Sequence, residues 1–301
     1  MIYKLYFLIF HMSTSSHYFA VSENDLSWGL HVLNCGTSIV PAGELFPSKK
    51  HPESYQFNWK RGRVLYEFQI IYLIEGAGVF ESKESGTIKL EQGSVIFIFP
   101  HVWHRYKPDK NKKWHTYWIG FGGDFTKKLI KNINITKASP IKQIGYHENI
   151  IRVFMDILET SQFEFTGYQQ VLAGEVVKLI GWVHALQRKA EFKKHNVDKI
   201  IQTAKTLLIQ DNFTGNPEWV AEELNMSYSK FRKLFKDYTG LAPGQFQMRH
   251  KITAACNMLN EGKDTIKEIS INLGFETPQY FTRIFKKKMG KSPSAYKNNL
   301  A

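Results

Sequence analysis

A repeated segment in the last third of the chain constrains its fold more than any other feature of the sequence. Residues 227–243 read SYSKFRKLFKDYTGLAP, and residues 277–293 read TPQYFTRIFKKKMGKSP. The two copies align Phe231 with Phe281, Phe235 with Phe285, Gly240 with Gly290 and Phe246 with Tyr296. A segment that recurs in this way indicates one supersecondary unit used twice.

Each copy has the pattern of two helices joined by a tight turn. The first copy predicts a helix over 218–224, a turn at 225–226 and a second helix capped by Ser227. The second copy predicts a helix that ends near residue 273, a turn over 274–276 and a second helix capped by Thr277. The apolar residues expected in the core are Val220, Ala221, Leu224, Phe231, Leu234 and Phe235, and in the second copy Ile266, Ile269, Leu273, Phe281, Ile284 and Phe285. A helix over 243–260 is expected to join the copies as a rigid spacer.

The polar face left on the second helix of each copy predicts contact with DNA. In a helix-turn-helix, such side chains reach base edges in the major groove, and neighbouring Lys and Arg neutralise phosphates. The candidates are Ser229, Arg232, Lys233 and Lys236 in the first copy, and Gln279, Tyr280, Thr282, Arg283 and Lys286 in the second. The alternative is an ordinary helical bundle with solvated basic faces; the duplicated caps, phenylalanine pairs and Gly-x-x-Pro endings favour the DNA-binding interpretation. A net charge of +13 agrees with a polyanionic partner.

The region before the repeat predicts a different kind of domain. Turn-rich, β-branched and aromatic runs over 26–122 are typical of an all-β barrel or sandwich, and helical periodicity follows over 148–163 and 168–192. The apolar seam of that last helix, Leu172, Val176, Leu179 and Val183, is expected either to dimerise or to pack on the barrel. The expected organisation is α+β: an N-terminal arm over 1–25, a sensing and dimerisation domain over 26–186, a basic linker over 187–196 and the DNA-binding domain over 197–301.

The N-terminus and the cysteines bear on the cellular compartment. The apolar run over 5–10 is too short for a signal peptide or a membrane span. Residues 1–11 are interpreted as an upstream extension before a start at Met12, or as a short apolar tail. Two cysteines, Cys35 and Cys256, do not make a disulfide framework. We therefore expect a cytoplasmic protein with no membrane partner.

The sequence resembles a known family at this point. Residues 274–296 are similar along their whole length to the signature of AraC/XylS-type transcription regulators, and residues 75–78, 90–100, 104–106 and 118–121 are similar to the family's cupin-like sensor barrel. The resemblance implies a homodimeric, ligand-responsive regulator that binds double-stranded DNA. It also implies an activator of carbohydrate-utilisation genes that contacts RNA polymerase. The resemblance places the family's base-reading positions on Ser229, Arg232, Lys233, Gln279, Tyr280, Thr282 and Arg283.

The resemblance also places an effector site in the barrel. In the family's arabinose-sensing member, the sugar-binding positions correspond to Arg61, Tyr106, Thr116 and Trp118 here, with Thr116 standing where that member has a histidine. Strand alternation puts Thr116 and Trp118 on one face and Tyr117 on the other. An aromatic face and a planar guanidinium suit a sugar. The alternative is that the aromatic residues only fill the core.

A metal enzyme is the competing interpretation of the barrel. His101, His104 and His115 lie close in sequence, and cupin enzymes bind metals through histidines and a glutamate. The strand that should carry the first cupin motif, residues 68–75, contains no histidine, and a catalytic zinc usually needs three protein ligands. We therefore expect no metal, no cofactor and no enzymatic activity. A third possibility is a constitutive architectural DNA-binding protein with a vestigial barrel.

Overall fold

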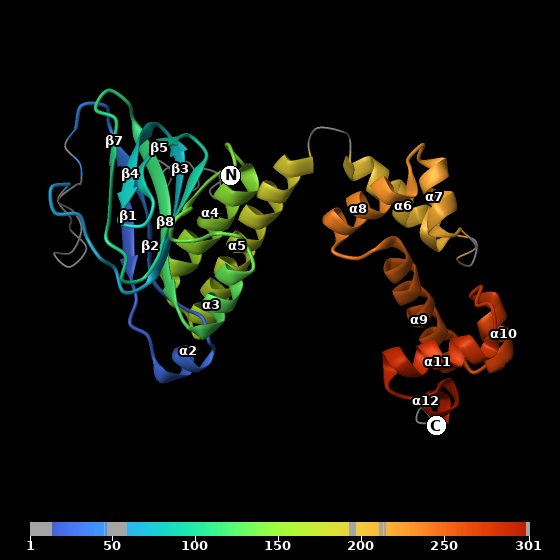
Figure 1. Ribbon diagram of the computed structural model, residues 1–301. Coiled ribbons are helices and arrows are strands. Elements are labelled where there is room, and N and C mark those ends of the chain that lie inside the picture. The colour runs from blue at the N-terminus through green and yellow to red at the C-terminus, as the bar shows by residue number, and fades with distance from the viewer. Residues whose placement is uncertain are drawn as a thin grey trace, which may run out of the picture. The chain divides into compact units, whose positions relative to one another are not determined.

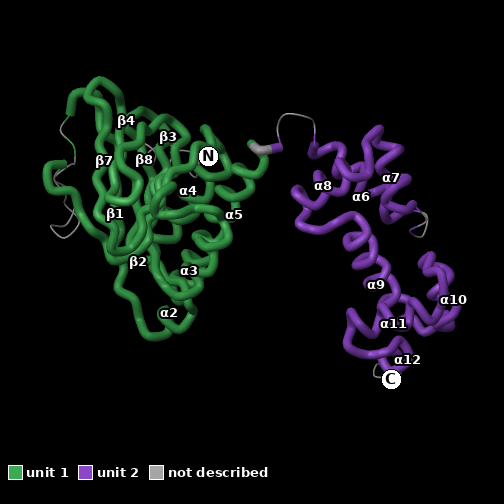
Figure 2. The backbone as a smooth tube through the Cα atoms, in the orientation of Figure 1, with its two compact units in different colours: residues 1–191 green, residues 192–301 purple. Residues whose placement is uncertain are grey.

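The computed structural model describes residues 14–44, 46, 59–192, 197–210, 213 and 215–298. The chain divides into two compact units, residues 1–191 and 192–301 (Figure 2). The first unit combines sheets with helices, and the described part of the second unit is helical. The two-domain α+β architecture expected from the sequence is therefore confirmed.

The first unit contains two antiparallel sheets (Figure 1). The larger sheet has the strand order β1-β2-β8-β3-β6-β9, and the smaller has the order β5-β4-β7. The strands are β1 Ser15–Tyr18, β2 His31–Val40, β3 Phe68–Glu75, β4 Ala77–Ser82, β5 Gly86–Glu91, β6 Ser94–Ile98, β7 His104–Pro108, β8 Trp114–Gly122 and β9 Ile141–Gln143.

Strand alternation divides the apolar side chains of the larger sheet between two cores. On β3, Ile70 and Tyr72 belong to a core shared with helices, whereas Ile71 and Leu73 belong to a core shared with Phe80 of the smaller sheet. The two sheets therefore face each other across the second core. On β8, Tyr117 packs toward the helices and Trp118 toward the smaller sheet, which confirms the predicted alternation.

In the described part of the first unit, four helices accompany the sheets: α2 Glu23–Ser27, α3 Asp124–Lys131, α4 Glu148–Phe163 and α5 Tyr168–Phe192. The structure confirms the predicted helices over 148–163 and 168–192. The Gln169 side-chain amide accepts a hydrogen bond from the Val32 N–H and donates one to the Val32 carbonyl, both at 3.0 Å. These bonds anchor the start of α5 beside the bulge in β2 that follows Val32.

The apolar seam of α5 faces inward. Leu172, Val176, Leu179 and Val183 are all fully buried in the core that includes the larger sheet and α4. Of the two roles expected for this seam, the structure supports packing within the unit, because its side chains already have partners there. α5 also continues to Phe192 and so includes residues expected to form a linker.

The second unit contains the two helix-turn-helix copies and the helix that joins them. Its helices are α6 Val197–Ile209, α7 Pro217–Glu223, α8 Tyr228–Thr239, α9 Pro243–Glu261, α10 Ile266–Asn272, α11 Pro278–Met289 and α12 Pro293–Asn298. Each copy has its own core: Phe231 and Phe235 pack with α6 and α7, and Phe281 and Phe285 pack with α9 and α10. Figure 1 shows α9 running from α6–α8 to α10–α12.

Candidate nucleic-acid interface and effector site

The two helix-turn-helix copies have closely matching internal geometry. The Phe231 and Phe235 rings meet edge-on with centroids 5.6 Å apart, and Phe281 and Phe285 do the same at 5.6 Å. Phe235 then contacts Phe246 at 5.4 Å, and Phe285 contacts Tyr296 at 5.5 Å. The residue alignment predicted from the repeat is therefore confirmed in its packing.

The helix caps of the two copies differ. Thr277 begins α11, and its hydroxyl accepts a hydrogen bond from the Tyr280 N–H at 3.1 Å. Ser227 occupies the matching position before α8 but makes no side-chain capping bond. Both second helices end at a left-handed glycine, Gly240 or Gly290, where a side chain would strain the backbone.

Most of the predicted DNA-contacting side chains lie on exposed faces of α8 and α11. The exposed candidates are Ser229, Arg232, Lys233 and Lys236 on α8, and Gln279, Arg283 and Lys286 on α11. Lys230 on α8 and Lys287 and Lys288 at the end of α11 are also exposed. These faces are basic, as contact with the phosphate backbone requires.

Two of the predicted positions on α11 are only half-buried, with internal contacts. The Thr282 hydroxyl donates to the Pro278 carbonyl of its own helix at 2.9 Å. The Tyr280 ring packs beside Phe275, and the Arg283 guanidinium lies 5.4 Å from the Tyr280 ring centroid. Tyr280 therefore supports Arg283 from one side, which limits the directions in which Arg283 projects.

A network of polar side chains lies on the inner faces of the two sheets, with Arg63 at its centre. The Arg63 Nη2 donates to Gln69 Oε1 at 3.3 Å and to the Tyr106 hydroxyl at 3.1 Å, and its Nε donates to His104 Nε2 at 3.2 Å. Its guanidinium carbon also lies 5.6 Å from the Tyr106 ring centroid. The network therefore joins the segment before β3 to the smaller sheet.

His104 is held neutral in this network. Burial, and after it the positive charge of Arg63, lower the pKa of His104 from 6.5 to about 3. Because Nε2 accepts from Arg63, the ring proton resides on Nδ1, which lies 3.0 Å from the Val102 carbonyl. The imidazole is therefore a fixed hydrogen-bond acceptor on its inner side.

Two further buried polar residues, Asn34 and Glu67, extend the network from Gln69 across the larger sheet. Gln69 Nε2 donates to Asn34 Oδ1 at 3.3 Å, and Asn34 Nδ2 donates to Glu67 Oε1 at 3.2 Å. All three side chains are at least nine-tenths buried. Gly120 pairs with both Asn34 and Gln69, and a side chain at Gly120 would overlap the Asn34 amide.

Trp118 and Thr116 lie further along the inner face of β8. Trp118 pairs with Gly36 and Ile71, and its indole occupies the space where a side chain at Gly36 would stand. Thr116 pairs with Ser38 and is buried. Tyr106, Thr116 and Trp118 therefore lie on strand faces directed toward the interior, as the sequence predicts.

Arg61 differs from the other predicted effector residues because it is exposed. Its carbonyl accepts a hydrogen bond from the Trp103 indole at 2.8 Å, which fixes the local backbone outside the sheets. The arginine whose side chain joins the interior network is Arg63, two residues later.

The three histidines considered as metal ligands are not brought together. His104 lies in the interior network, and the His115 Nε2 lies 2.9 Å from the Thr37 hydroxyl on the helix-covered side of β8. His101 is exposed and packs against the Tyr66 ring. Among the described residues, no group of three or more His, Cys, Asp or Glu side chains has metal-binding geometry.

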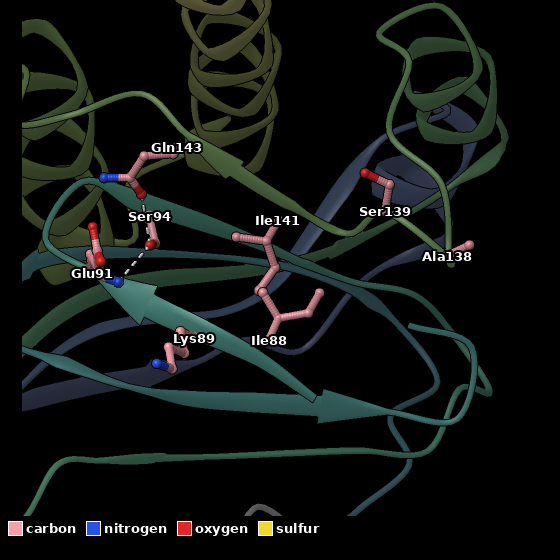
Figure 3. Close-up of a pocket in the computed structure, with 8 residues that line it drawn as sticks. All are labelled: Ile88, Lys89, Glu91, Ser94, Ala138, Ser139, Ile141 and Gln143. Carbon is pink, nitrogen blue, oxygen red and sulfur yellow. Dashed lines mark hydrogen bonds between the residues drawn. The ribbon is translucent and has the colours of Figure 1, made fainter. Parts of the chain in front are cut away.

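A pocket of about 300 Å³ opens between β5, β6 and β9 (Figure 3). Ile88 and Ile141 form its apolar part. The Ser94 hydroxyl accepts a hydrogen bond from the backbone N–H of Glu91 at 3.0 Å and donates one to the Gln143 side chain at 2.8 Å. None of the predicted effector residues lines it.

Sequence reasoning missed Arg63, Asn34, Glu67 and Gln69. One signal could have identified part of the set. Glu67, Gln69, Ile71 and Leu73 are spaced two residues apart, so in an extended strand all four share one face. Polar side chains on an otherwise apolar strand face indicate either a binding site or a buried network.

Two family models match the chain. The model described as an AraC-like ligand binding domain matches residues 44–177, and the model described as a helix-turn-helix domain matches residues 220–299. None of the described helices is both long enough and apolar enough to span a membrane.

Relatives with whole-chain similarity are regulatory proteins. The Msm operon regulatory protein of Streptococcus mutans is 24% identical over 267 residues, covering 85% of this chain and 91% of that protein. The raffinose operon transcriptional regulatory protein RafR of Pediococcus pentosaceus is 20% identical over 251 residues, covering 81% of this chain and 89% of that protein. The crystal structure of unsaturated fatty acid bound wild-type ToxT from Vibrio cholerae matches 89% of this chain and 95% of its own at 15% identity, with a TM-score of 0.33.

Proposed function

The chain belongs to the AraC family of transcription regulators, and on that premise we propose that it activates carbohydrate-utilisation genes in response to a small sugar. The second unit binds promoter DNA through α8 and α11, and the first unit binds the sugar between its two sheets. The family is one of regulators and not of enzymes. A regulator of this kind works in the cytoplasm, where it reaches promoter DNA and RNA polymerase.

The DNA-binding role rests on the duplicated basic faces of α8 and α11. Arg283 projects from α11 beside Tyr280 and is the residue that we assign to base reading. Lys286 is exposed near the end of the same helix and is assigned to a phosphate. The assignment predicts that replacing the two residues will reduce DNA affinity in different ways, because a base contact depends on the DNA sequence and a phosphate contact does not.

Titration of DNA binding at several salt concentrations tests both assignments. Arg283→Ala should cost about 1–3 kcal/mol on the specific site and relax specificity there. Lys286→Ala should weaken binding to specific and scrambled duplexes alike and lower the salt slope by about 1. Binding that is unchanged in both variants would remove α11 from the DNA interface.

The sugar proposal is carried by the mixture of donors and acceptors around Arg63. The network combines a guanidinium, amides, a phenol, a neutral imidazole and a carboxylate, with Trp118 further along the same inner face. A sugar hydroxyl both donates and accepts, so it can replace either partner in such a network. An aromatic ring can also pack on the apolar C–H face of a sugar. The name of the raffinose operon relative agrees with this class of effector.

A thermal-shift screen against a sugar library identifies the effector. A ligand at 100 times its dissociation constant should stabilise the protein by about 2.7 kcal/mol. Arg63→Met and Tyr106→Phe should each weaken binding of the sugar found by at least tenfold. Ser94→Ala and Gln143→Leu, in the pocket between β5 and β9, are matched controls that should leave the affinity unchanged. No shift with any sugar would favour the constitutive architectural alternative.

We place the homodimer contact on the outer face of α5, because its apolar seam is buried. The outer face carries Val171, Gly174, Val177, Gly181 and Ala185, all exposed. Gly174 and Gly181 have open space where a side chain would extend, so another helix can approach closely there. Sedimentation of the full chain at micromolar concentration tests this: a monomer would refute the dimer.

A further inference from the structure

Two side chains on α9, one helical turn apart, contact segments that belong to different parts of the second unit. Gln247 contacts the backbone that leads into the first helix-turn-helix copy, and Lys251 contacts the turn of the second copy. Residues four apart lie on the same helix face, so a single stretch of α9 holds both contacts. Neither residue belongs to the DNA-contacting set assigned above.

Gln247 binds the segment between α6 and α7. Its Nε2 donates to the Gly215 carbonyl at 2.6 Å and to the Leu208 carbonyl at 3.0 Å. Leu208 lies in the last turn of α6, whose carbonyls have no partner within the helix, and Gly215 lies just before α7. One amide therefore ties α9 to the end of one helix and to the approach of the next.

Lys251 is 8% exposed and binds the α10–α11 turn. Its Nζ donates to the Gly274 carbonyl at 2.9 Å, and burial lowers the pKa of Lys251. Gly274 follows the end of α10 with a positive φ of 63°, a conformation that favours glycine. Burying a lysine amine is costly unless a partner satisfies it, so this contact defines a specific position for the turn.

A ring from the first copy meets Lys251 as well. Phe213 lies between α6 and α7 yet packs against the core of the second copy. The Lys251 Nζ lies 5.9 Å from the Phe213 ring centroid and 5.1 Å from that of Phe275, which belongs to the α10–α11 turn. The segment before the first copy and the turn of the second copy thus both lie near one ammonium group.

We propose that Gln247 and Lys251 are positioning residues that lock the two helix-turn-helix copies in one relative placement, so that DNA is read at one fixed spacing between half-sites. The spacing part rests on the DNA-binding function proposed above, whereas the locking part concerns the protein alone. α9 joins the copies covalently, but a helix can bend. The Gln247 and Lys251 contacts brace the segments on either side of α9 and restrict that bending.

The locking is tested on the full-length protein without DNA by electron-electron distance measurements. Spin labels are attached through Glu222→Cys on α7 and Lys267→Cys on α10, both exposed, in a Cys256→Ser background. Lys251→Met removes the ammonium and keeps the apolar stem, and Gln247→Leu removes the amide. Lys199→Met, at an exposed position on α6, is the control for lost charge.

The labelled protein with Gln247 and Lys251 intact should give one narrow distribution of distances between the two spin labels. Lys251→Met and Gln247→Leu should each broaden it at least twofold, while Lys199→Met leaves it unchanged. Circular dichroism monitors the folding of each variant. If Lys251→Met or Gln247→Leu fails to fold, the distance distribution of the other variant tests the locking. Unchanged widths in the folded variants, or equal broadening in the control, would overturn the proposal.

The spacing consequence is tested with duplexes that the full chain selects from random DNA. Insertion of one base pair between the half-sites should weaken wild-type binding at least tenfold but Lys251→Met binding less than threefold. The salt slope should not change, because Lys251 is buried away from phosphates. A variant that keeps the full spacing penalty would overturn the spacing claim. If the wild-type chain selects no duplex, the DNA-binding proposal fails and the distance measurement still judges the locking.

Discussion

The buried imidazole of His104 predicts that the stability of the first unit depends on pH. Burial and then the charge of Arg63 lower the pKa of His104 from 6.5 to about 3. Between these two values the unfolded chain binds a proton that the folded chain does not. The free energy of unfolding should therefore fall as the pH is lowered through this range, and the stabilisation is present above pH 6.5.

The size of the effect follows from the shift. One pKa unit corresponds to about 1.36 kcal/mol, so lowering the pH from 7.5 to 4.5 should remove about 2.5 kcal/mol through His104 alone. His17 and His31 also have pKa values lowered by burial and act in the same direction. The difference between the wild type and His104→Gln isolates the contribution of His104.

Urea unfolding followed by tryptophan fluorescence measures this difference. Six of the seven tryptophans lie in residues 1–191, so the signal reports mainly on the first unit. His104→Gln should lower stability at pH 7.5 but should lose about 2.5 kcal/mol less than the wild type on moving to pH 4.5. His101→Asn, at an exposed position with positive φ that asparagine tolerates, should keep the wild-type pH dependence. If His104→Gln also keeps that dependence, the imidazole is not the buried neutral group described here.

Three further predictions concern the packing, and two of them compare a pair of substitutions. Thr277→Ala should destabilise the second unit by about 1 kcal/mol in urea unfolding followed by circular dichroism, because it removes a capping bond, whereas Ser227→Ala should have little effect. Leu179→Glu should unfold the first unit because it places a charge in the core. Val177→Glu, at an exposed position on the same helix, should leave the unit folded. In sedimentation, Val177→Glu should weaken the proposed dimer. Gly36→Ala should cost about 1–3 kcal/mol by overpacking the Trp118 indole, and the fluorescence maximum should shift; an unchanged spectrum would contradict the described contact.

The helices over 148–163 and in the repeat were predictable from the sequence because their apolar spacing continues over several turns, whereas the shorter helices α2 and α3 were not predicted. The pattern over 148–163 and the repeat after residue 218 each contain several turns of consistent apolar spacing, and the structure agrees closely with both. The strands β1, β7 and β9 were not predicted. They have three to five residues each, too few for alternation to distinguish them from loops.

Two features of the first unit could not be placed from the sequence, for the same physical reason. Periodicity identifies which residues of an element share a face but not what covers that face. The seam around Leu179 was correctly grouped, yet its partner is the sheet within the same unit. We expected Arg61 to point into the barrel, whereas the interior network contains Arg63, because the segment before β3 has no alternation that fixes its register.

The duplicated phenylalanine geometry separates what holds each helix-turn-helix together from what it recognises. Both copies keep the same ring contacts, while their outward faces differ at every base-reading candidate. The outward residues of α11 could therefore be grafted onto α8 without disturbing the scaffold beneath. Such a chimera should prefer a tandem of identical half-sites over the natural bipartite one. Each helix-turn-helix copy thus provides a constant scaffold, and the DNA sequence that it recognises should be exchangeable through its outward residues alone.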